Sequence, residues 1–335
     1  MTLNALAAVT DLIGPQLAAV DAQFRQELTS DLKCVGTLVR HVGRFRGKML
    51  RPCLLLLTAR AVNPRAEPTA DHVRLATVVE MVHMATLVHD DVLDEAELRR
   101  KGATINHLRG NEAAVLLGDY LISHSYHLCS GADDAAVGLP PQYASRLVAR
   151  TTNRVCEGEL LQLDNRNNLD LNEPTYLDII ARKTAALTAA CCRLGAAFAG
   201  ADAETADRME EYGLALGTAF QIQDDILDLT GDPRDVGKTL GIDVEKGKLT
   251  LPLIHFLRTA PAEHRALLRS LLTEPNPDKA EKIRNLILPG DSLRYARDRA
   301  RALVDRARSC LLDLPDTEAR HALDAMAEFV VARAE

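Results

Sequence analysis

The sequence has 335 residues, of which 47% are hydrophobic and 4% aromatic, and its net charge is −7. This composition can bury a large core and favours closely packed helices over a sandwich or a barrel, while the acidic balance argues against a general nucleic-acid partner. Residues 32–66 nevertheless hold eight basic residues and no acid. That segment is either a solvated basic face or an anion site.

Helical periodicity dominates the chain. An apolar stripe predicts the first helix, at Leu12, Leu17, Val20 and Phe24. Further helices are expected over residues 52–62, 70–98, 112–129, 140–165, 176–199 and 203–229. After a loop rich in glycine and charge at residues 230–248, helices resume at Thr250, with interruptions near Pro275, Pro277, Pro289 and Pro315. Because no segment predicts a strand, the sequence indicates one all-α domain over residues 1–335.

The cysteines and the N-terminal segment indicate the cellular compartment. Seven cysteines form no CxxC pair, and most lie among apolar residues, which predicts reduced thiols. The N-terminal segment carries Asp11 and no basic residue before Arg25, unlike a signal peptide. No uncharged apolar run reaches membrane-spanning length. We therefore expect a cytoplasmic protein without a transmembrane segment.

Two acidic stretches, DDVLD and DDILD, each end a long apolar segment and lie 134 residues apart. On a helix, residues four apart share one face, so Asp90 with Asp94, and Asp224 with Asp228, would form acidic walls whose like charges repel. Mg²⁺ offsets such repulsion, since it binds carboxylate oxygens and completes its shell with waters and substrate phosphates. One such stretch alone would be read as a solvated helix end, but two indicate a metal site.

Basic residues accompany both acidic stretches. They are Lys48 and Arg51 in RGKMLRP, Arg99 and Arg100 after the first stretch, Lys183 beside Thr184 in RKTAAL, and Lys238 and Lys248 after the second. Each alone would be taken for a surface charge. A polyphosphate bound through Mg²⁺ also needs cations from the protein, so their placement beside the acidic stretches indicates a diphosphate site.

With these motifs, the chain resembles a trans-isoprenyl diphosphate synthase over roughly residues 40–260. HDDVLD followed by two arginines resembles the first aspartate-rich motif of that family, and FQIQDDILD resembles the second. The family's order is also followed by GKMLRP, EGELLQL, RKTAAL, GKTLGID and EKGKLTLP. The subgroup that the chain resembles is the long-chain, octaprenyl-type synthases. The resemblance implies an all-α isoprenoid-synthase helical bundle around a central apolar cavity, with C-terminal helices at residues 261–335.

The resemblance also implies a reaction and a set of roles. Isopentenyl diphosphate would condense, in a Mg²⁺-dependent prenyl transfer, with an allylic diphosphate such as geranyl or farnesyl diphosphate to give a longer all-trans polyprenyl diphosphate. Mg²⁺, three ions per active site, would be held on the allylic diphosphate by Asp90, Asp94, Asp224 and Asp228. That diphosphate would be gripped by Arg99, Lys183, Lys238 and Lys248. Isopentenyl diphosphate would be bound by Lys48, Arg51, His83 and Arg100.

Two further residues, Thr184 and Gln221, would lie near the forming allylic cation and also contact substrate. The catalytic set implied by the resemblance is thus Asp90, Asp94, Lys183, Thr184, Gln221, Asp224 and Lys238. His83 has an alternative interpretation as a satisfied core histidine. We expect Asp119 to be a buried hydrogen-bonding acid. The family also implies a homodimer.

Product length is predicted from the helix that precedes the first acidic motif. Side chains four and five positions before the motif, Thr86 and Ala85, lie one turn below it, and Val82 and Met81 lie a further turn down. A turn is about 5.4 Å, roughly one isoprene unit, and no aromatic ring blocks this face. We therefore expect a product of the octaprenyl class. The alternative is that these side chains are small for packing and that the helix carrying Tyr120 closes the tunnel.

Three other functions remain open from the sequence. A shorter-chain farnesyl or geranylgeranyl diphosphate synthase would share all the motifs. A terpene cyclase or squalene-type synthase would not need the residues assigned to isopentenyl diphosphate or a second full DDxxD. A non-catalytic subunit of a heterodimeric synthase should have lost aspartates or lysines, and none is lost here.

Overall fold

A computed structural model describes residues 3–45, 47, 49–100, 102–231, 241–276 and 278–332, with side chains from residue 11 onward. The elements up to the second strand are α1 (Leu3–Glu27), α2 (Lys33–Val42), the 3₁₀ turn η1 (Gly43–Phe45), α3 (Leu50–Val62), α4 (Ala70–Leu93), β1 (Leu98–Arg99) and β2 (Gly102–Ala103). They are followed by α5 (Ile105–Arg109), α6 (Asn111–Cys129), the 3₁₀ turn η2 (Ala135–Val137), α7 (Tyr143–Asp164), α8 (Glu173–Ile180), η3 (Ala181–Ala185) and α9 (Ala186–Phe198). The last elements are α10 (Ala203–Thr230), α12 (Ile242–Glu245), α13 (Leu251–Thr259), α14 (Ala262–Thr273), α15 (Lys279–Ile287), α16 (Ser292–Ser309) and α17 (Glu318–Ala332).

The all-α prediction is confirmed, with one local exception. Within the described residues the strands are β1 and β2, two residues each, paired antiparallel. The expected helix to residue 98 was wrong, because α4 ends at Leu93 and Glu95 adopts a left-handed conformation with φ 50°. The amide of Asn106 then donates to the carbonyl of Ala96 at 3.0 Å, which stabilises the turn. The expectation that no segment forms a strand was also wrong.

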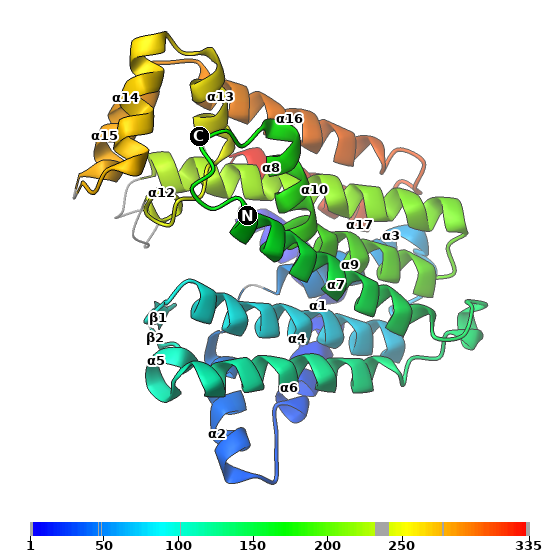
Figure 1. Cartoon of the computed structure of the whole chain (residues 1–335). Coiled ribbons are helices and arrows are strands. Elements are labelled where there is room, and N and C mark those ends of the chain that lie inside the picture. The colour runs from blue at the N-terminus through cyan, green and yellow to red at the C-terminus, as the bar shows by residue number, and fades with distance from the viewer. Residues whose placement is uncertain are drawn as a thin grey trace. The chain divides into compact units, whose positions relative to one another are not determined.

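The described residues form two compact units that alternate along the chain (Figure 1). Unit 1 comprises residues 1–152, 187–213 and 313–324, and unit 2 comprises residues 153–186, 214–312 and 325–335. Helices α7, α9, α10 and α17 supply residues to both units. Whether the chain is one domain, as the sequence indicates, stays a prediction.

In unit 1, α4 and α6 lie side by side and run in opposite directions (Figure 1). A methyl group at Gly118 would collide with the His89 ring, so only glycine permits this approach, and His89 Nε2 lies 3.1 Å from the carbonyl of Val115. Asp119 is 65% exposed and lies 3.6 Å from His89, so the expected burial was wrong. The core beside α4 is built from Phe24, Leu28, Val39, Val42, Phe45, Met81, Met84, Ala85, Val88, Ile105, Ala114, Leu117 and Leu121.

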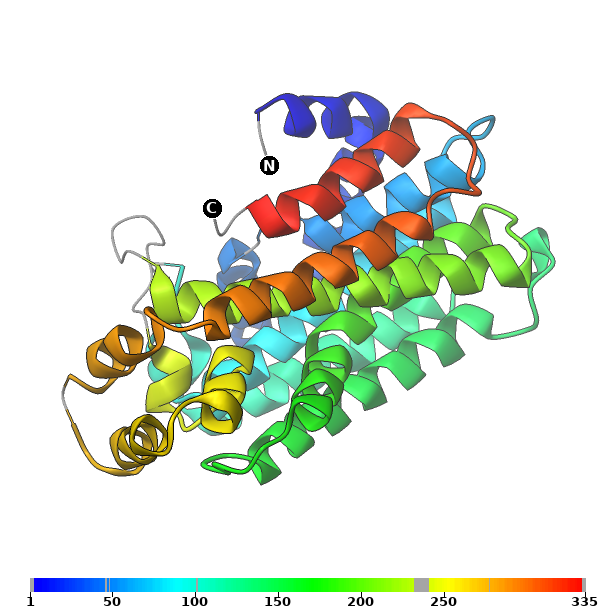
Figure 2. The ribbon, with the colours of Figure 1, turned by 90° about the horizontal axis from the view of Figure 1, so that it is seen from above.

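In unit 2, Glu173 at the start of α8 connects this helix to α16. Its carboxylate accepts hydrogen bonds from the Tyr295 hydroxyl at 2.6 Å and from Nε of Arg299 at 2.9 Å, both on α16. Helix α16 also packs against α13, and α14 and α15 form a hairpin (Figures 1 and 2). In the part of the chain that the structure describes, no helix is long and apolar enough to cross a membrane.

Candidate active site

The first acidic motif ends α4 and divides its aspartates between two environments. Asp91 is buried and accepts a 2.8 Å hydrogen bond from Nε of Arg99. Asp90 and Asp94 remain partly exposed, and the Asp94 amide donates to the Asp90 carbonyl at 2.8 Å as α4 closes. The C-terminal end of a helix carries partial negative charge. The two outer carboxylates, the pair expected from spacing, therefore suit a hydrated cation.

A basic cluster lies near this motif in unit 1 and consists of Arg51, His83, Arg99 and Arg100. Burial and the charges of Arg51, Arg100 and Arg99 hold the pKa of the His83 imidazole well below its ordinary value, so this ring is neutral at pH 7. Arg100 donates from Nη1 to the carbonyl of Phe45 at 2.7 Å. Nε of Arg51 is buried and has no hydrogen-bond partner in the described residues. Three guanidinium groups around a neutral ring can accommodate an anion.

A glycine permits part of this cluster to form. A methyl group at Gly47, which precedes Lys48 in the sequence, would lie 2.6 Å from Nη2 of Arg100. Lys48 and Lys238, two of the predicted site residues, lie outside the described residues.

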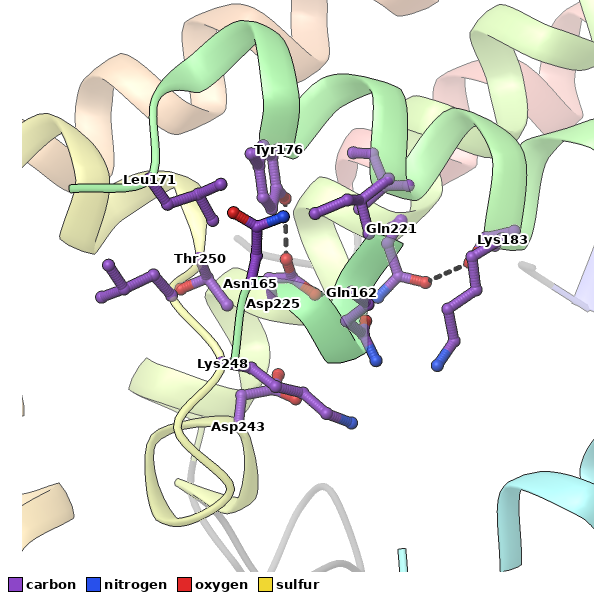
Figure 3. A pocket seen from close by; sticks show the side chains of 14 residues that line it. Gln162, Asn165, Leu171, Tyr176, Lys183, Gln221, Asp225, Asp243, Lys248 and Thr250 are labelled. Atoms are coloured by element: carbon purple, nitrogen blue, oxygen red, sulfur yellow. Dashed lines mark hydrogen bonds between the residues drawn. The ribbon is translucent and has the colours of Figure 1, made fainter. Parts of the chain in front are cut away.

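In unit 2, four predicted residues line one pocket of about 110 Å³ (Figure 3). They are Lys183, Thr184, Gln221 and Lys248, and the sequence places them on three separate segments. The pocket is also lined by Gln162, Tyr176, Asp225 and Asp243. Neither Asp224 nor Asp228 is among its lining residues. The acidic and amide side chains of α10 therefore divide between the pocket and a second face of the helix.

A chain of hydrogen bonds crosses this pocket. The Thr184 hydroxyl donates to Oε1 of Gln221 at 2.9 Å, and Nε2 of Gln221 donates to Asp225 at 2.8 Å. The Tyr176 hydroxyl donates to the other carboxylate oxygen of Asp225 at 2.7 Å. Burial raises the pKa of Asp225 well above its ordinary value, and the charge of Asp243 adds to the shift. Both oxygens of this buried acid are thus hydrogen-bonded, as a buried polar group requires.

Lys183 and Thr184 lie in η3, a π-helical turn between α8 and α9. Such turns occur frequently at functional sites, because the added residue redirects neighbouring side chains. Lys183 forms an ion pair with Glu159 of α7, while Thr184 bonds to α10. The bend that separates these two consecutive side chains was not predicted from the sequence.

The second acidic motif adjoins the short helix α12. A carboxylate oxygen of Asp228 accepts from the backbone amide of Asp243 at 3.2 Å, and the Gly241 amide donates to the Asp228 carbonyl at 3.0 Å. Burial and the charge of Asp243 raise the pKa of Asp228 to about 6. A bound cation would favour the ionised form, so this cluster of carboxylates fits a divalent metal.

In the described parts of the chain, no three histidine, cysteine or acidic side chains form a ready-made metal cluster. Paired carboxylates without a third such ligand suit an ion that takes its remaining ligands from water and substrate phosphate, which is how Mg²⁺ is usually bound.

Several residues of the site were missed from the sequence. Asp243 lies within GKTLGID, a stretch quoted for its family resemblance, so position in that motif was the available signal. Tyr176 precedes Lys183 by seven residues, two helical turns, and lies on the same face. Glu159 and Gln162 lie in EGELLQL, also part of the resemblance.

The described residues include acidic helix ends, arginines around one acidic motif and lysines beside the other. This combination is typical of a helical enzyme that binds diphosphates. The family model for polyprenyl synthetases matches residues 33–287. The chain belongs to the polyprenyl synthetase family and is a prenyltransferase. The family and the enzyme class predicted from the sequence are thereby confirmed.

Similar proteins cover almost the whole chain. The octaprenyl diphosphate synthase of Escherichia coli (strain K12) is 34% identical over 329 residues, which span 98% of this chain and 99% of that protein. The crystal structure of a decaprenyl diphosphate synthase from Rhodobacter capsulatus aligns with a TM-score of 0.88 and 35% identity, covering 98% of each chain. A polyprenyl synthase from Caulobacter crescentus CB15, complexed with calcium and isoprenyl diphosphate, aligns with a TM-score of 0.87 and 32% identity, again over 98% of each chain.

Proposed function

We propose that the protein joins isopentenyl diphosphate head-to-tail to an allylic diphosphate and makes an all-trans polyprenyl diphosphate of the octaprenyl class. The observation that carries this proposal is the convergence of Lys183, Thr184, Gln221 and Lys248 on one pocket. A pocket with two ammonium groups, a hydroxyl and an amide suits a diphosphate attached to a carbon that becomes cationic. The near full-length similarity to an octaprenyl diphosphate synthase supports the product class.

The allylic diphosphate would be held through metal ions and cations. We assign the metal ions to Asp90, Asp94, Asp224 and Asp228, with three Mg²⁺ per site. When bound, Mg²⁺ neutralises charge on the diphosphate and makes it a better leaving group. The calcium and isoprenyl diphosphate bound to the Caulobacter protein support a divalent ion beside a diphosphate. Arg99, Lys183 and Lys248 would supply the protein's own positive charge, together with Lys238.

The reaction itself needs positioning and electrostatic stabilisation. The allylic C–O bond breaks and its electron pair leaves with the diphosphate. The double bond of isopentenyl diphosphate then supplies the electrons of the new C–C bond, and a proton passes to the released diphosphate. The Thr184 hydroxyl donates its hydrogen bond to Gln221, so the lone pairs of its oxygen can face the allylic cation.

Isopentenyl diphosphate would bind at the basic cluster. Arg51 and Arg100 would contact its phosphates, with Lys48 beside them, and the neutral His83 ring would donate a hydrogen bond. The buried Nε of Arg51 has no partner in the described residues, which supports a ligand at this position.

The growing chain would pass along α4. Ala85, Val82 and Met81 are fully buried, and the half-buried Thr86 donates its hydroxyl to the carbonyl of His83 at 2.8 Å. Small side chains in the first turn would leave room for a long product, which supports the octaprenyl class over the farnesyl class.

We also propose a cytoplasmic homodimer. The exposed side chains of Leu108, Val115 and Leu116 are 47%, 42% and 68% accessible, and they lie close in sequence on α5 and α6. Burial of such a patch between two copies would stabilise a dimer. All seven cysteines are free thiols, which suits a reducing compartment.

The direct test supplies the purified protein with Mg²⁺, farnesyl diphosphate and radiolabelled isopentenyl diphosphate, followed by mass spectrometry of the extracted lipid. We expect a linear product of about eight isoprene units. A product that stops at farnesyl or geranylgeranyl length would support the shorter-chain alternative. A cyclic hydrocarbon would indicate a cyclase, and no incorporation by the chain alone would indicate a subunit that needs a partner.

A further inference from the structure

The middle aspartate of the second acidic motif differs from its neighbours. Asp225 is buried, lines the pocket and has both carboxylate oxygens hydrogen-bonded, one to Tyr176 and one to Gln221. Asp224 and Asp228, by contrast, are partly exposed and do not line the pocket. Figure 3 shows Tyr176, Gln221 and Asp225 pointing toward one another. This arrangement distinguishes Asp225 from the two aspartates assigned to the metal ions.

We propose that Asp225 and Tyr176 are positioning residues that fix the side-chain amide of Gln221 in one orientation, so that Thr184 presents its oxygen lone pairs to the pocket. This inference rests on the proposed function, because it concerns the stabilisation of the allylic cation.

The argument begins with what an amide can bond to. Gln221 has one end that donates and one that accepts, and rotation by half a turn exchanges them. Asp225 lies four residues away on the same face of α10. Its Oδ1 accepts from the NH₂ end of Gln221 and its Oδ2 accepts from Tyr176, so neither oxygen bonds to the carbonyl end. The carbonyl end must then face Thr184.

Tyr176 fixes the carboxylate in turn. Its hydroxyl donates to the second oxygen of Asp225 from α8, so the carboxylate is held from two helices and cannot rotate away. Tyr176 is itself buried, so its hydroxyl is shielded from bulk water. The carboxylate therefore accepts from fixed donors on two sides.

The hydroxyl of Thr184, the last residue in this series of hydrogen bonds, is held in one orientation. A threonine hydroxyl has a single proton, and in Thr184 that proton forms the hydrogen bond to Gln221. Only lone pairs remain for the pocket, and lone pairs stabilise a developing positive charge. If the amide of Gln221 were reversed, its NH₂ group would donate to the Thr184 oxygen, and the hydroxyl proton would turn into the pocket toward the cation.

The first test is Asp225→Asn, which keeps the size of the side chain and allows its amide to donate as well as accept. We expect kcat to fall about 10- to 100-fold, less than the roughly 100- to 1,000-fold loss when a donor that contacts the reacting group is removed, because Asp225 acts through Gln221. The KM for both diphosphates should change less than about threefold, and the Mg²⁺ concentration for half-maximal rate should stay as in the wild type. An increased Mg²⁺ requirement, or a loss of the melting-temperature increase produced by Mg²⁺ with inorganic diphosphate, would identify Asp225 as a metal ligand and overturn the inference.

A second variant exchanges the acid of Asp225 and the amide of Gln221 between the two positions. In Asp225→Asn combined with Gln221→Glu, the new amide can donate to the new carboxylate, which again accepts from Thr184. We expect this double variant to recover at least about tenfold in kcat over Asp225→Asn, a non-additive result that a purely structural role does not produce. No recovery, with both proteins folded, would contradict the inference.

Tyr176→Phe tests the same series of hydrogen bonds with a smaller change. It provides a second measurement if Asp225→Asn does not fold. It should lower kcat about 3- to 10-fold at unchanged KM, since the carboxylate is then held from one side only. The matched control is Tyr295→Phe, which removes an equivalent hydroxyl bond to the carboxylate of Glu173 outside the pocket. Equal loss of kcat in both variants would overturn the inference. If the wild-type protein showed no prenyl transfer, the proposed function itself would be contradicted. Failure of the proposed function is therefore distinguishable from failure of this inference.

Discussion

Gly158 on α7 packs directly against the backbone of Lys183 in the π-helical turn. A methyl group at this glycine would lie 2.9 Å from the Cα atom of Lys183 and 2.8 Å from Cβ of Arg182, and would collide with the Lys183 nitrogen. Backbone atoms cannot move aside as the end of a flexible side chain can. The glycine therefore allows α7 to support the turn that carries Lys183 and Thr184.

We predict that Gly158→Ala displaces this turn. The unfolding free energy should fall by about 1–3 kcal/mol, as for other overpacked sites, and kcat/KM should fall more than tenfold because Lys183 and Thr184 move together. Steady-state kinetics and thermal melting measure both effects. The matched control is Gly131→Ala, where the nearest atom would be 3.5 Å away. If Gly158→Ala kept wild-type kinetics, the π turn would not position these residues.

The outer aspartates should be essential for turnover. We predict that Asp90→Ala or Asp224→Ala abolishes turnover at saturating Mg²⁺ and leaves helicity unchanged in circular dichroism. Each change also removes a like-charge repulsion, so the melting temperature without metal should hold or rise. Asp298→Ala, an exposed aspartate on α16, serves as the control and should remain active. Near-normal turnover in either variant would contradict the metal assignment.

Asp228 should make the metal-free protein less stable as the pH rises. Its pKa in the folded protein is about 6 against an ordinary value of 3.8. Folding therefore favours the protonated form, and the contribution of Asp228 to stability is largest below pH 3.8 and lost as the pH rises through about 6. Asn resembles the protonated acid and does not ionise.

We predict that Asp228→Asn matches the wild type near pH 4 and is more stable at pH 7, by on the order of 1–2 kcal/mol after allowance for partial exposure. Urea unfolding at several pH values without metal measures this difference. Mg²⁺ with inorganic diphosphate should reduce it, because a cation favours ionised Asp228. A difference that does not change with pH would show that Asp228 does not cause it.

The basic cluster should discriminate between the two substrates. We predict that Arg100→Ala and Lys48→Ala raise the apparent KM for isopentenyl diphosphate about tenfold and the KM for the allylic substrate much less. The reason is that a charge-assisted contact to only one diphosphate is lost. Arg109→Ala, an exposed arginine on α5, is the control for charge alone. Equal increases for both substrates would show that the two diphosphates are not divided in this way.

Product length should respond to a ring one turn below the first acidic motif. We predict that Ala85→Phe shortens the product to about farnesyl or geranylgeranyl length with geranyl and farnesyl primers, since the ring would fill the first turn of the tunnel. Ala85 is fully buried, so overpacking should also cost about 1–3 kcal/mol of stability. Mass spectrometry of the product and a melting curve separate the two effects. An unchanged product spectrum from a folded variant would mean that the chain does not pass this face.

The sequence by itself determined the elements that depend on near neighbours. Apolar spacing predicted the helices because it follows the period of a single helix, and the i to i+4 spacing placed Asp90 and Asp94 together. The motifs also selected Lys183, Thr184, Gln221 and Lys248, which line one pocket although they come from distant parts of the chain. The resemblance to a known family was what joined those segments, since local periodicity carries no information about them.

Only the tertiary structure decided how these side chains are held. Asp225 follows Asp224 directly, yet it is distinguished by a hydrogen bond to Tyr176, 49 residues away. The π turn at Lys183 depends on contact with Gly158 from another helix. The end of α4 depends on a bond between Asn106 and Ala96 across a left-handed turn. In each case the deciding contact lies beyond the reach of one helical turn, so no pattern within a helix could reveal it.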